Sequence, residues 1–561
     1  MLQLHRAAPQ AGYDREVLEI ASRNQSRVFT EMMRQADVAK FSADPVFLGL
    51  KRKREDLHEK IENLRLAMVT MPLNQPGTDA RRSDLAAQLA AANGELTPLE
   101  DALWRDYPRF MELTNPRPVT LQELQQKLLR PDEVLLSYVL LPQEVAIFAV
   151  TRERFQMVNL PVKREDVAQR VRAIRRAIEK VAVGESVLFL REIEPANLNS
   201  LYRDLVAPLA SALAGRQKII VVADGPLLTV PLELLVTRYG PAEQQAFEST
   251  RAASDGSAGR PFLGEYGALS YLGQEHRFAY LPSLSALASQ RLYPKQPAGL
   301  RQELTAFADP IFAPPPGQSY SPATRAALGL LANNYRVGKD GLPDIPRLKE
   351  TADEARSIAQ ILGGSNRMFI GDEAQEHMAK SGELKNSRYV LFATHGFLGG
   401  EFLPGTEPAA DHAAGAPRAK GGAQPSLALT LVGDLHGEDG MLTMKEVIED
   451  VELNADLVAL SACNTAGETA QANNGEGFAG LTRAFMFAGA RSLLVSHWSV
   501  DSLSTEALMT STFRHIKQGE GALKAVNDAQ RELRDGSYTS GQYRFSRSHP
   551  FFWAAFVYVG D

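Results

Sequence analysis

The stretch DLVALSACNTAGE, residues 456–468, contains Cys463, the single cysteine among the 561 residues of the chain. It begins with a short apolar run and continues into small and polar residues, a pattern typical of a buried strand that runs into a turn. A second stretch, RYVLFATHG at residues 388–396, has the same form and ends in His395 and Gly396. Binding sites of open α/β sheets lie at the carboxyl ends of strands, so both stretches are predicted to end at a site.

Short β-branched runs alternate with amphipathic patterns from residue 113 to the end of the chain, which predicts an α/β fold with a parallel or mixed sheet covered on both faces. Residues 1–112 instead carry Leu, Ala, Arg, Glu and Gln at helical spacing, and this region is predicted to be α-helical. The length exceeds what a single core normally supports. We therefore expect a helical region at 1–112, a first α/β half at 113–292 and a second α/β half at 293–561.

The composition is that of an ordinary globular protein, with 44% hydrophobic residues, 23% charged residues and a net charge of −6. This charge provides no basic field for nucleic acid or anionic lipid, so neither partner is expected. A single cysteine cannot form an internal disulfide, and the sequence contains no apolar run long enough to span a bilayer. The expected location is the cytoplasm.

Three polar or Gly-, Ala- and Pro-rich stretches, at 238–261, 310–345 and 399–426, are predicted to be loops or mobile insertions. The third lies between the two strands that end in His395 and Cys463. In the first half, one strand ends in Asp224 and a later one ends near Ser283. Their separation in the sequence is similar to that between His395 and Cys463. Either an ancient duplication or coincidence among α/β folds explains this similarity.

A cysteine thiol becomes a useful nucleophile when an imidazole or a helix N-terminus lowers its pKa and the thiol is partly exposed. Cys463 and His395, each at a strand end and with Gly396 after the histidine, fit that chemistry. A lone cysteine is more often a small buried hydrophobe, and a lone histidine at a strand end is usually structural. The residues by themselves leave both interpretations open.

The segments FATHG, LVALSACNTAGE, GEGFAGLTRAFMFAGARSLLVSHWSVD and HPFFWAAFVYVG closely resemble the CHAT family of caspase-like, separase-related cysteine peptidases. Weaker similarity extends the resemblance over about residues 115–561. It implies a caspase-like three-layer α/β sandwich, with an inactive half before an active peptidase half. The preceding helices resemble the tail of a tetratricopeptide repeat array, and the resemblance implies that this chain is the C-terminal part of a protein with such an array.

The resemblance assigns roles to individual residues. Cys463 would attack the scissile carbonyl, His395 would protonate the leaving amine, and the backbone N–H groups of Gly396 and Cys463 would form the oxyanion hole. No carboxylate is implied as an orienting group for the histidine. Asp501 or Glu506 would select a basic side chain before the cut bond, although Asp501 is equally placed to cap the helix that begins near residue 503.

The predicted function is therefore a cysteine endopeptidase that acts on protein substrates without a metal or other cofactor. The resemblance also implies control by a regulatory partner or an upstream sensor, and in bacteria a companion effector as substrate, such as a gasdermin-like pore former. The competing class is a catalytically silent interaction scaffold. The hypothesis of a nucleotide-binding oxidoreductase rests only on the motif GEGFAG at 475–480. This motif does not directly follow a predicted strand, as a dinucleotide-binding fingerprint must.

Overall fold

The structure is a computed structural model, and the part of the chain that it describes has internal gaps. The described residues are 2–35, 45–70, 78–107, 111, 118–182, 184–292, 299–331, 341–397, 425–461, 463–464, 476–498 and 501–561. Among the described helices, none is both long enough and apolar enough to cross a membrane. Most of the loop predicted at 399–426 lies outside the described residues.

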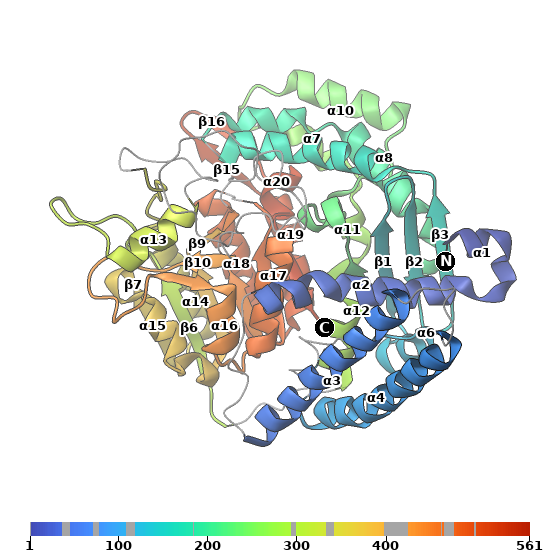
Figure 1. Cartoon of the computed structure of the whole chain (residues 1–561). Helices are drawn as coiled ribbons and strands as arrows, with labels where there is room; N and C mark the ends of the chain where they lie inside the picture. The colour runs from blue at the N-terminus through green and yellow to red at the C-terminus, as the bar shows by residue number, and fades with distance from the viewer. Residues whose placement is uncertain are drawn as a thin grey trace. The chain divides into compact units, whose positions relative to one another are not determined.

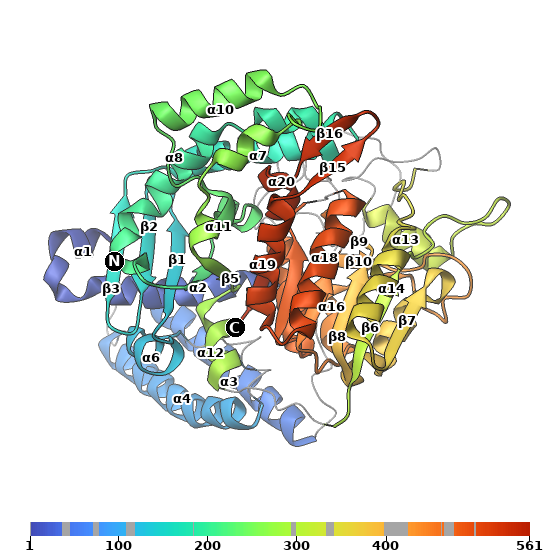
Figure 2. The ribbon, with the colours of Figure 1, turned by 180° about the vertical axis from the view of Figure 1, so that it is seen from behind.

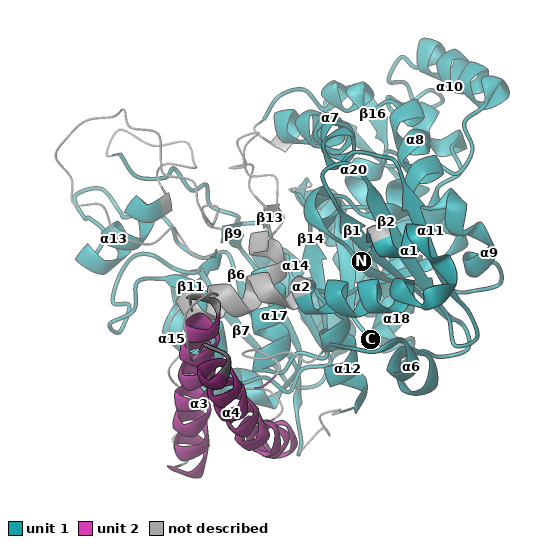
Figure 3. Cartoon of the chain, turned by 45° about the vertical axis from the view of Figure 1, so that its right-hand side comes forward, with its two compact units in different colours: residues 1–25, 118–561 teal, residues 26–117 magenta. Residues whose placement is uncertain are grey.

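The chain divides into two compact units, residues 1–25 with 118–561 and residues 26–117 (Figure 3). The smaller unit contains α3 (Pro45–Thr70) and α4 (Thr78–Asp106), which pack against each other. Leu57, Ile61 and Leu64 are buried, as the helical spacing predicts. The division of the sequence into regions 1–112, 113–292 and 293–561 stays a prediction.

The larger unit is built on one 11-stranded sheet, in the order β3-β2-β1-β4-β5-β17-β14-β12-β8-β6-β7 (Figure 1). Seven of its ten strand pairs are parallel, and the antiparallel pairs are β1–β2, β2–β3 and β14–β17. The strands are β1 (Glu133–Leu140), β2 (Val145–Val150), β3 (Phe155–Leu160), β4 (Lys218–Val222), β5 (Arg277–Tyr280), β6 (Gln302–Ala308), β7 (Asn366–Ile370), β8 (Ser387–Ala393), β12 (Leu457–Leu460), β14 (Ser492–Ser496) and β17 (Phe556–Gly560).

Helices cover both faces of this sheet, as the alternating pattern predicts. Figure 1 shows α17 on one face, and Figure 2 shows α18 and α19 on the other, where α18 packs against both α14 and α19. The helices of the larger unit are α1 (Leu2–Ala7), α2 (Tyr13–Gln35, up to residue 25), α6 (Leu121–Glu123), α7 (Arg164–Ala182), α8 (Pro195–Leu205), α9 (Ala210–Leu213), α10 (Pro241–Ala253), α11 (Leu272–Glu275), α12 (Leu284–Leu292), α13 (Pro322–Leu331), α14 (Thr351–Leu362), α15 (Glu376–Lys380), α16 (Met444–Glu449), α17 (Glu476–Ala488), α18 (Ser502–Lys517), α19 (Ala522–Arg534) and α20 (Pro550–Trp553).

A second, four-stranded sheet lies beyond the carboxyl ends of β8 and β12, in the order β11-β10-β9-β13. Its strands are β9 (His395–Phe397), β10 (Ser426–Ala428), β11 (Met441–Thr443) and β13 (Cys463–Asn464). The chain passes from β8 into β9 after one residue and from β12 into β13 after two. The small sheet therefore receives both strand ends that the sequence analysis singled out. A separate hairpin consists of β15 (Ser537–Ser540) and β16 (Tyr543–Ser546).

The loop prediction for 238–261 is wrong, because α10 occupies residues 241–253. The helix starts at Pro241, and the Glu243 side chain accepts a hydrogen bond from the Gly240 backbone N–H. Phe247 is its one fully buried aromatic residue and packs edge-on against Tyr266. A polar helix held by a single large apolar side chain shows little hydrophobic periodicity, so composition alone suggests a loop. In the same way, α13 lies within the loop predicted at 310–345.

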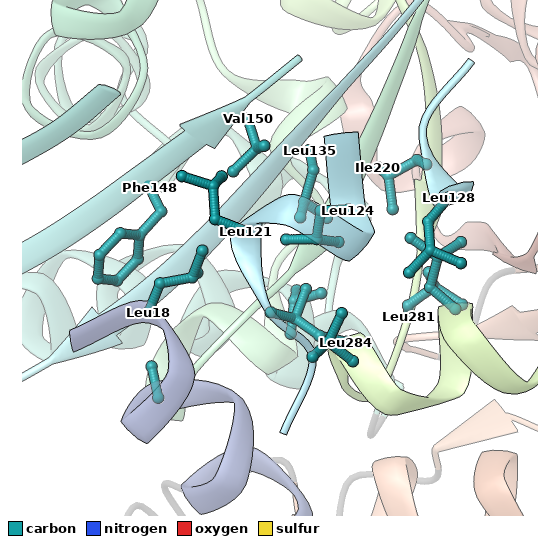
Figure 4. Packing of buried hydrophobic residues seen from close by; sticks show 14 of the residues in the cluster. Leu18, Leu121, Leu124, Leu128, Leu135, Phe148, Val150, Ile220, Leu281 and Leu284 are labelled. Atoms are coloured by element: carbon teal, nitrogen blue, oxygen red, sulfur yellow. The ribbon is translucent and has the colours of Figure 1, made fainter. Parts of the chain in front are cut away.

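Buried apolar side chains from distant segments pack together beneath β1, β2 and β4 (Figure 4). Leu18 of α2 lies against this core together with Leu121 and Phe148, and Leu284 of α12 closes it from another side. Each fully buried Leu or Phe side chain contributes about 1.5–3 kcal/mol to folding. This packing fixes residues 13–25 of the helical N-terminal region on the first half of the sheet.

A buried ion network joins the two halves of the sheet at the junction of β5 and β17. Arg291 donates two hydrogen bonds of 2.7 Å to the carboxylate of Glu133, and it also pairs with Asp561, which follows β17. Lys218 bonds the same two carboxylates at 3.3 and 3.1 Å. The Glu133 side chain is 1% exposed and that of Arg291 is 6% exposed. The network thus ties the last strand to β1, β4 and α12.

Replacing Arg291 by Met is expected to lower the free energy of unfolding by about 3 kcal/mol, because it leaves the Glu133 carboxylate buried with one cation fewer. Arg130 also pairs with Asp561 at 2.7 Å, but its side chain is 57% exposed. Arg130→Met is the matched control and is expected to cost less than about 1 kcal/mol. Thermal and urea unfolding of both variants measure the difference, and equal losses would contradict the assignment.

Candidate active site

Cys463 and His395 are direct neighbours in the small sheet. Strand β13 pairs with β9 in parallel, with Cys463 opposite His395 and Asn464 opposite Gly396. Residues paired on neighbouring strands lie about 5 Å apart between backbones. Two residues separated by 67 others in the sequence are thus brought side by side, at the carboxyl ends of adjacent strands of the large sheet.

The His395 side chain is 3% exposed and has one hydrogen-bond partner in the described part of the chain. Its Nε2 lies 2.7 Å from the backbone carbonyl oxygen of Pro346. A carbonyl only accepts, so Nε2 carries the proton and Nδ1 holds the free lone pair. Nδ1 has no hydrogen-bond partner among the described residues. The imidazole is therefore presented as a base through Nδ1.

Burial lowers the pKa of His395 below its ordinary value of 6.5. The hydrogen bond to the Pro346 carbonyl and the negative charge of Glu350 act in the opposite direction without cancelling the effect of burial. The ring of Phe312 packs at 5.2 Å from the imidazole, between ring centroids. His395 is consequently neutral at pH 7 and able to take up a proton.

The Pro346 carbonyl is held in place by contacts of the segment that follows it. Arg347 forms a two-bonded ion pair with Asp309, at 2.7 and 2.8 Å, directly after β6. The Thr351 hydroxyl accepts from the Asp309 backbone N–H at 2.8 Å and donates to the Leu348 carbonyl at 2.7 Å. The orienting group of the histidine is thus a backbone atom anchored to the end of β6, and among the described residues no carboxylate forms a hydrogen bond with the ring.

The structure places the two predicted substrate-binding acids on α18. Asp501 is the N-cap of this helix, since its Oδ1 accepts from the Ser504 backbone N–H at 3.1 Å. The capping interpretation of Asp501 is confirmed. Glu506 lies in the second turn of the same helix and is partly exposed. A role for either residue in substrate binding stays a prediction.

Two site features were not found from the sequence. The Pro346 carbonyl is a backbone atom and leaves no signal in the side-chain pattern. Glu354 leaves one, because it falls on the buried face of α14 with Ala355, Ile358 and Leu362, where an apolar residue is expected. Glu354 is 3% exposed and hydrogen-bonded by the side chain of Ser461, two residues before Cys463.

The other motifs considered in the sequence have structural roles where they are described. Residues 476–480 of the GEGFAG segment belong to α17, in which Leu481 and Phe485 are buried. Two groups of acidic residues and histidine are close enough for a metal ion in the described part of the chain. One of them, Glu376 with Glu438 and Glu446, surrounds the amino group of Lys380 at 2.7–2.9 Å, so a cation already occupies its centre.

Residues 195–561, more than half of the chain, match the CHAT domain family. The chain therefore belongs to the CHAT domain family, the caspase-like cysteine peptidase family that its motifs resemble. The predicted fold class, a caspase-like α/β sandwich preceded by a helical region, is confirmed. Among curated proteins, none matches the chain.

Solved structures with a similar arrangement include two of the separase–securin complex of Saccharomyces cerevisiae. The first is 9% identical with a TM-score of 0.41, and the aligned region covers 96% of this chain and 40% of the other. The second is 11% identical with a TM-score of 0.36, and covers 95% and 40%. The Arg-specific cysteine proteinase gingipain R is 8% identical with a TM-score of 0.26, and covers 71% and 74%. This chain thus spans less than half of the separase chains that it resembles.

The His395 ring is expected to be neutral at pH 7, with its proton on Nε2, and to become charged only below pH 6.5. Nitrogen NMR of histidine-labelled protein measures both properties, because the two tautomers differ in the shifts of their ring nitrogens. His395→Ala identifies the signal among the ten histidines. A pKa above 6.5, or a proton on Nδ1, would contradict the assigned geometry.

Proposed function

We propose that this chain is a cysteine endopeptidase in which Cys463 and His395 form the catalytic dyad. The observation that carries the proposal is the parallel pairing of Cys463 with His395 in the small sheet. Residues paired on neighbouring strands lie side by side, so this register supports a joint role of the two residues. The free lone pair on Nδ1 of His395 supplies the base that the thiol needs.

In the proposed reaction, His395 takes the thiol proton as the sulfur of Cys463 forms a bond to the scissile carbonyl carbon. The imidazolium then gives this proton to the leaving amine as the C–N bond breaks, which leaves a thioester. Water attacks the thioester, His395 again moves the proton, and the acid product and the free thiol are released. The hydrogen bond from Nε2 to the Pro346 carbonyl keeps Nδ1 aimed at the reacting atoms throughout.

The backbone N–H groups of Gly396 and Cys463 are proposed as the oxyanion hole. Gly396 follows His395 on β9 and is paired with Asn464 on one side and Leu427 on the other. Its missing side chain allows close approach of a substrate carbonyl. In other proteases one such donor is worth about 2.7–4 kcal/mol of transition-state stabilisation.

Control by a regulatory partner or sensor, and cleavage of a companion effector such as a gasdermin-like protein, are further parts of the proposal. They rest on the resemblance to the family. Cytoplasmic location also stays a prediction. The catalytically silent scaffold is the alternative that the two experiments below exclude or support.

Iodoacetamide is expected to modify Cys463 rapidly at neutral pH in the natural chain and at least about tenfold more slowly in His395→Ala, because the base that creates the thiolate is lost. The chain has a single cysteine, so the mass change reports on Cys463 alone. His276→Ala is the matched control, since the Nδ1 of His276 also lies near a backbone carbonyl, that of Arg216, at 2.8 Å. A slow reaction in all three proteins would favour a packed thiol and the scaffold.

Incubation of the protein with a proteome is expected to create new N-termini that are absent with Cys463→Ala. Mass spectrometry of labelled N-termini identifies them, and the residue before each cut gives the specificity. New termini that persist with Cys463→Ala would show a contaminating protease and contradict the assignment. The same comparison with added candidate partners tests for latency.

A further inference from the structure

The two strands that carry the proposed dyad each pass from the large sheet into the small one at a joint with a buried hydroxyl group. β8 passes into β9 through Thr394, whose hydroxyl donates a hydrogen bond to the Ala428 carbonyl of β10. β12 passes into β13 through residues 461 and 462, and the buried Ser461 side chain is hydrogen-bonded with the side chain of Glu354 on α14. Ser461 precedes Cys463 by two positions, so its contact with α14 bears on where the Cys463 backbone lies.

Glu354 is an unusual partner for Ser461, because it is a buried acid that no cation accompanies. Its side chain lies on the apolar face of α14 and is 3% exposed. Among the described residues, its Oε1 has no hydrogen-bond partner and its carboxyl group forms no ion pair. Such an acid is stable in a protein interior only in its neutral form. Other buried acids of this chain each pair with a lysine or arginine, namely Glu133, Glu265 and Glu376.

The first turn of α14 also supports the histidine of the dyad. The Thr351 hydroxyl fixes the segment that follows the Pro346 carbonyl, and this carbonyl orients His395. Thr351 and Glu354 are three positions apart and therefore lie on the same side of the helix. One helical turn thus supports one member of the dyad through a backbone carbonyl and the other through Ser461.

We propose that Glu354 is a positioning residue that, in its neutral carboxylic acid form, holds Ser461 and so keeps Cys463 in register with His395. This inference rests on the proposed peptidase function and adds a residue that touches neither the substrate nor the reacting atoms. The neutral form matters, because the thiol of Cys463 must lose its proton to react and a negative charge nearby opposes that loss.

The surroundings of Glu354 keep its carboxyl group neutral at pH 7. Burial raises the pKa of Glu354 to about 8, and the charges of Glu506 on α18 and of Glu350 before α14 add to this effect. On α14 itself, Asp353 and Arg356 pair with each other at the surface. The other charged residues of the elements packed against α14 are at the amino ends of β6, β7 and β8 and in the last turn of α18, namely Glu303, Arg367, Arg388, Arg514, His515 and Lys517. These residues lie toward the opposite end of α14.

The test measures the rate at which iodoacetamide modifies Cys463 in variants of the full chain. Glu354→Gln keeps the shape of the side chain and a neutral polar group, and is expected to react at the rate of the natural chain at pH 7. Glu354→Leu loses the hydrogen bond with Ser461 and is expected to react about tenfold more slowly, because a displacement of about 1 Å can cost up to about 100-fold in rate.

Glu233→Leu is the matched control for Glu354→Leu. Glu233 is also buried and without a cation among the described residues, but it lies in the first half of the sheet and is bonded by the Tyr280 hydroxyl. This variant is expected to react at the natural rate. Thermal unfolding of each variant, followed by circular dichroism, verifies that the compared proteins are folded.

Two double variants separate positioning from a general loss of structure. His395→Ala is expected to slow the modification in the natural chain and to have little further effect in Glu354→Leu, because the aligned pair is already lost there. Ser461→Ala is expected to slow it as much as Glu354→Leu does, and the combination of the two no more than either alone. Effects that simply multiply in both double variants would overturn the inference.

The ratio of the rate in the natural chain to that in Glu354→Gln gives the pH dependence. This ratio is expected to be constant below about pH 7 and to fall above pH 8, since the pKa of Glu354 is about 8 and the ionised carboxylate opposes formation of the thiolate. Titration of His395 and of Cys463 is common to both proteins and cancels in the ratio.

The results distinguish a failure of this inference from a failure of the peptidase function. Natural reactivity in Glu354→Leu, slow reaction of Glu354→Gln at pH 7, or a ratio that does not change with pH would overturn the inference, while the peptidase function stands as long as His395→Ala slows the natural chain. A slow reaction of the natural chain that does not depend on His395 would overturn the peptidase function and the inference together.

Discussion

The candidate site depends on the register between β9 and β13. In the large sheet Phe392 of β8 pairs with Leu460 of β12, and three residues further along each strand His395 pairs with Cys463. The register of two buried apolar strands is thus carried unchanged into the small sheet. A slip by one residue would move every side chain of a strand to the opposite face, which the buried surfaces of the large sheet prevent.

The orientation of the histidine has a consequence for its chemistry. A carboxylate bonded to Nε2 would stabilise the imidazolium and raise the pKa of the ring, whereas the Pro346 carbonyl is neutral and the ring is buried. The resting histidine is therefore a neutral base, not a preformed cation. The position of the imidazole therefore depends on the Asp309–Arg347 ion pair, which holds the segment that carries the Pro346 carbonyl.

The parts of the fold that are predictable from the sequence are those with a strong apolar period. The strands β8 and β12 have continuous apolar runs, and the buried stripe of α7, with Val167, Val171 and Ile174, follows helical spacing. Helix α10 was not predicted, because its single buried phenylalanine produces no apolar periodicity in the sequence. For Cys463 and His395, the sequence predicts only that both lie at the same edge of the sheet. Their register depends on strand order, which distant contacts decide.

The two halves of the sheet show a related arrangement of their strands. In the first half, β4 ends just before Asp224 and its parallel neighbour β5 ends just before Ser283, as β8 and β12 end before His395 and Cys463. Asp224 accepts a hydrogen bond from the Leu140 backbone N–H at 2.7 Å, and the Ser283 hydroxyl accepts one from the Ala286 backbone N–H at 3.3 Å. Both positions in the first half are therefore used to hold the backbone. In the second half, the imidazole Nδ1 of His395 has no hydrogen-bond partner among the described residues, and an enzyme needs such an uncommitted group to act on a substrate.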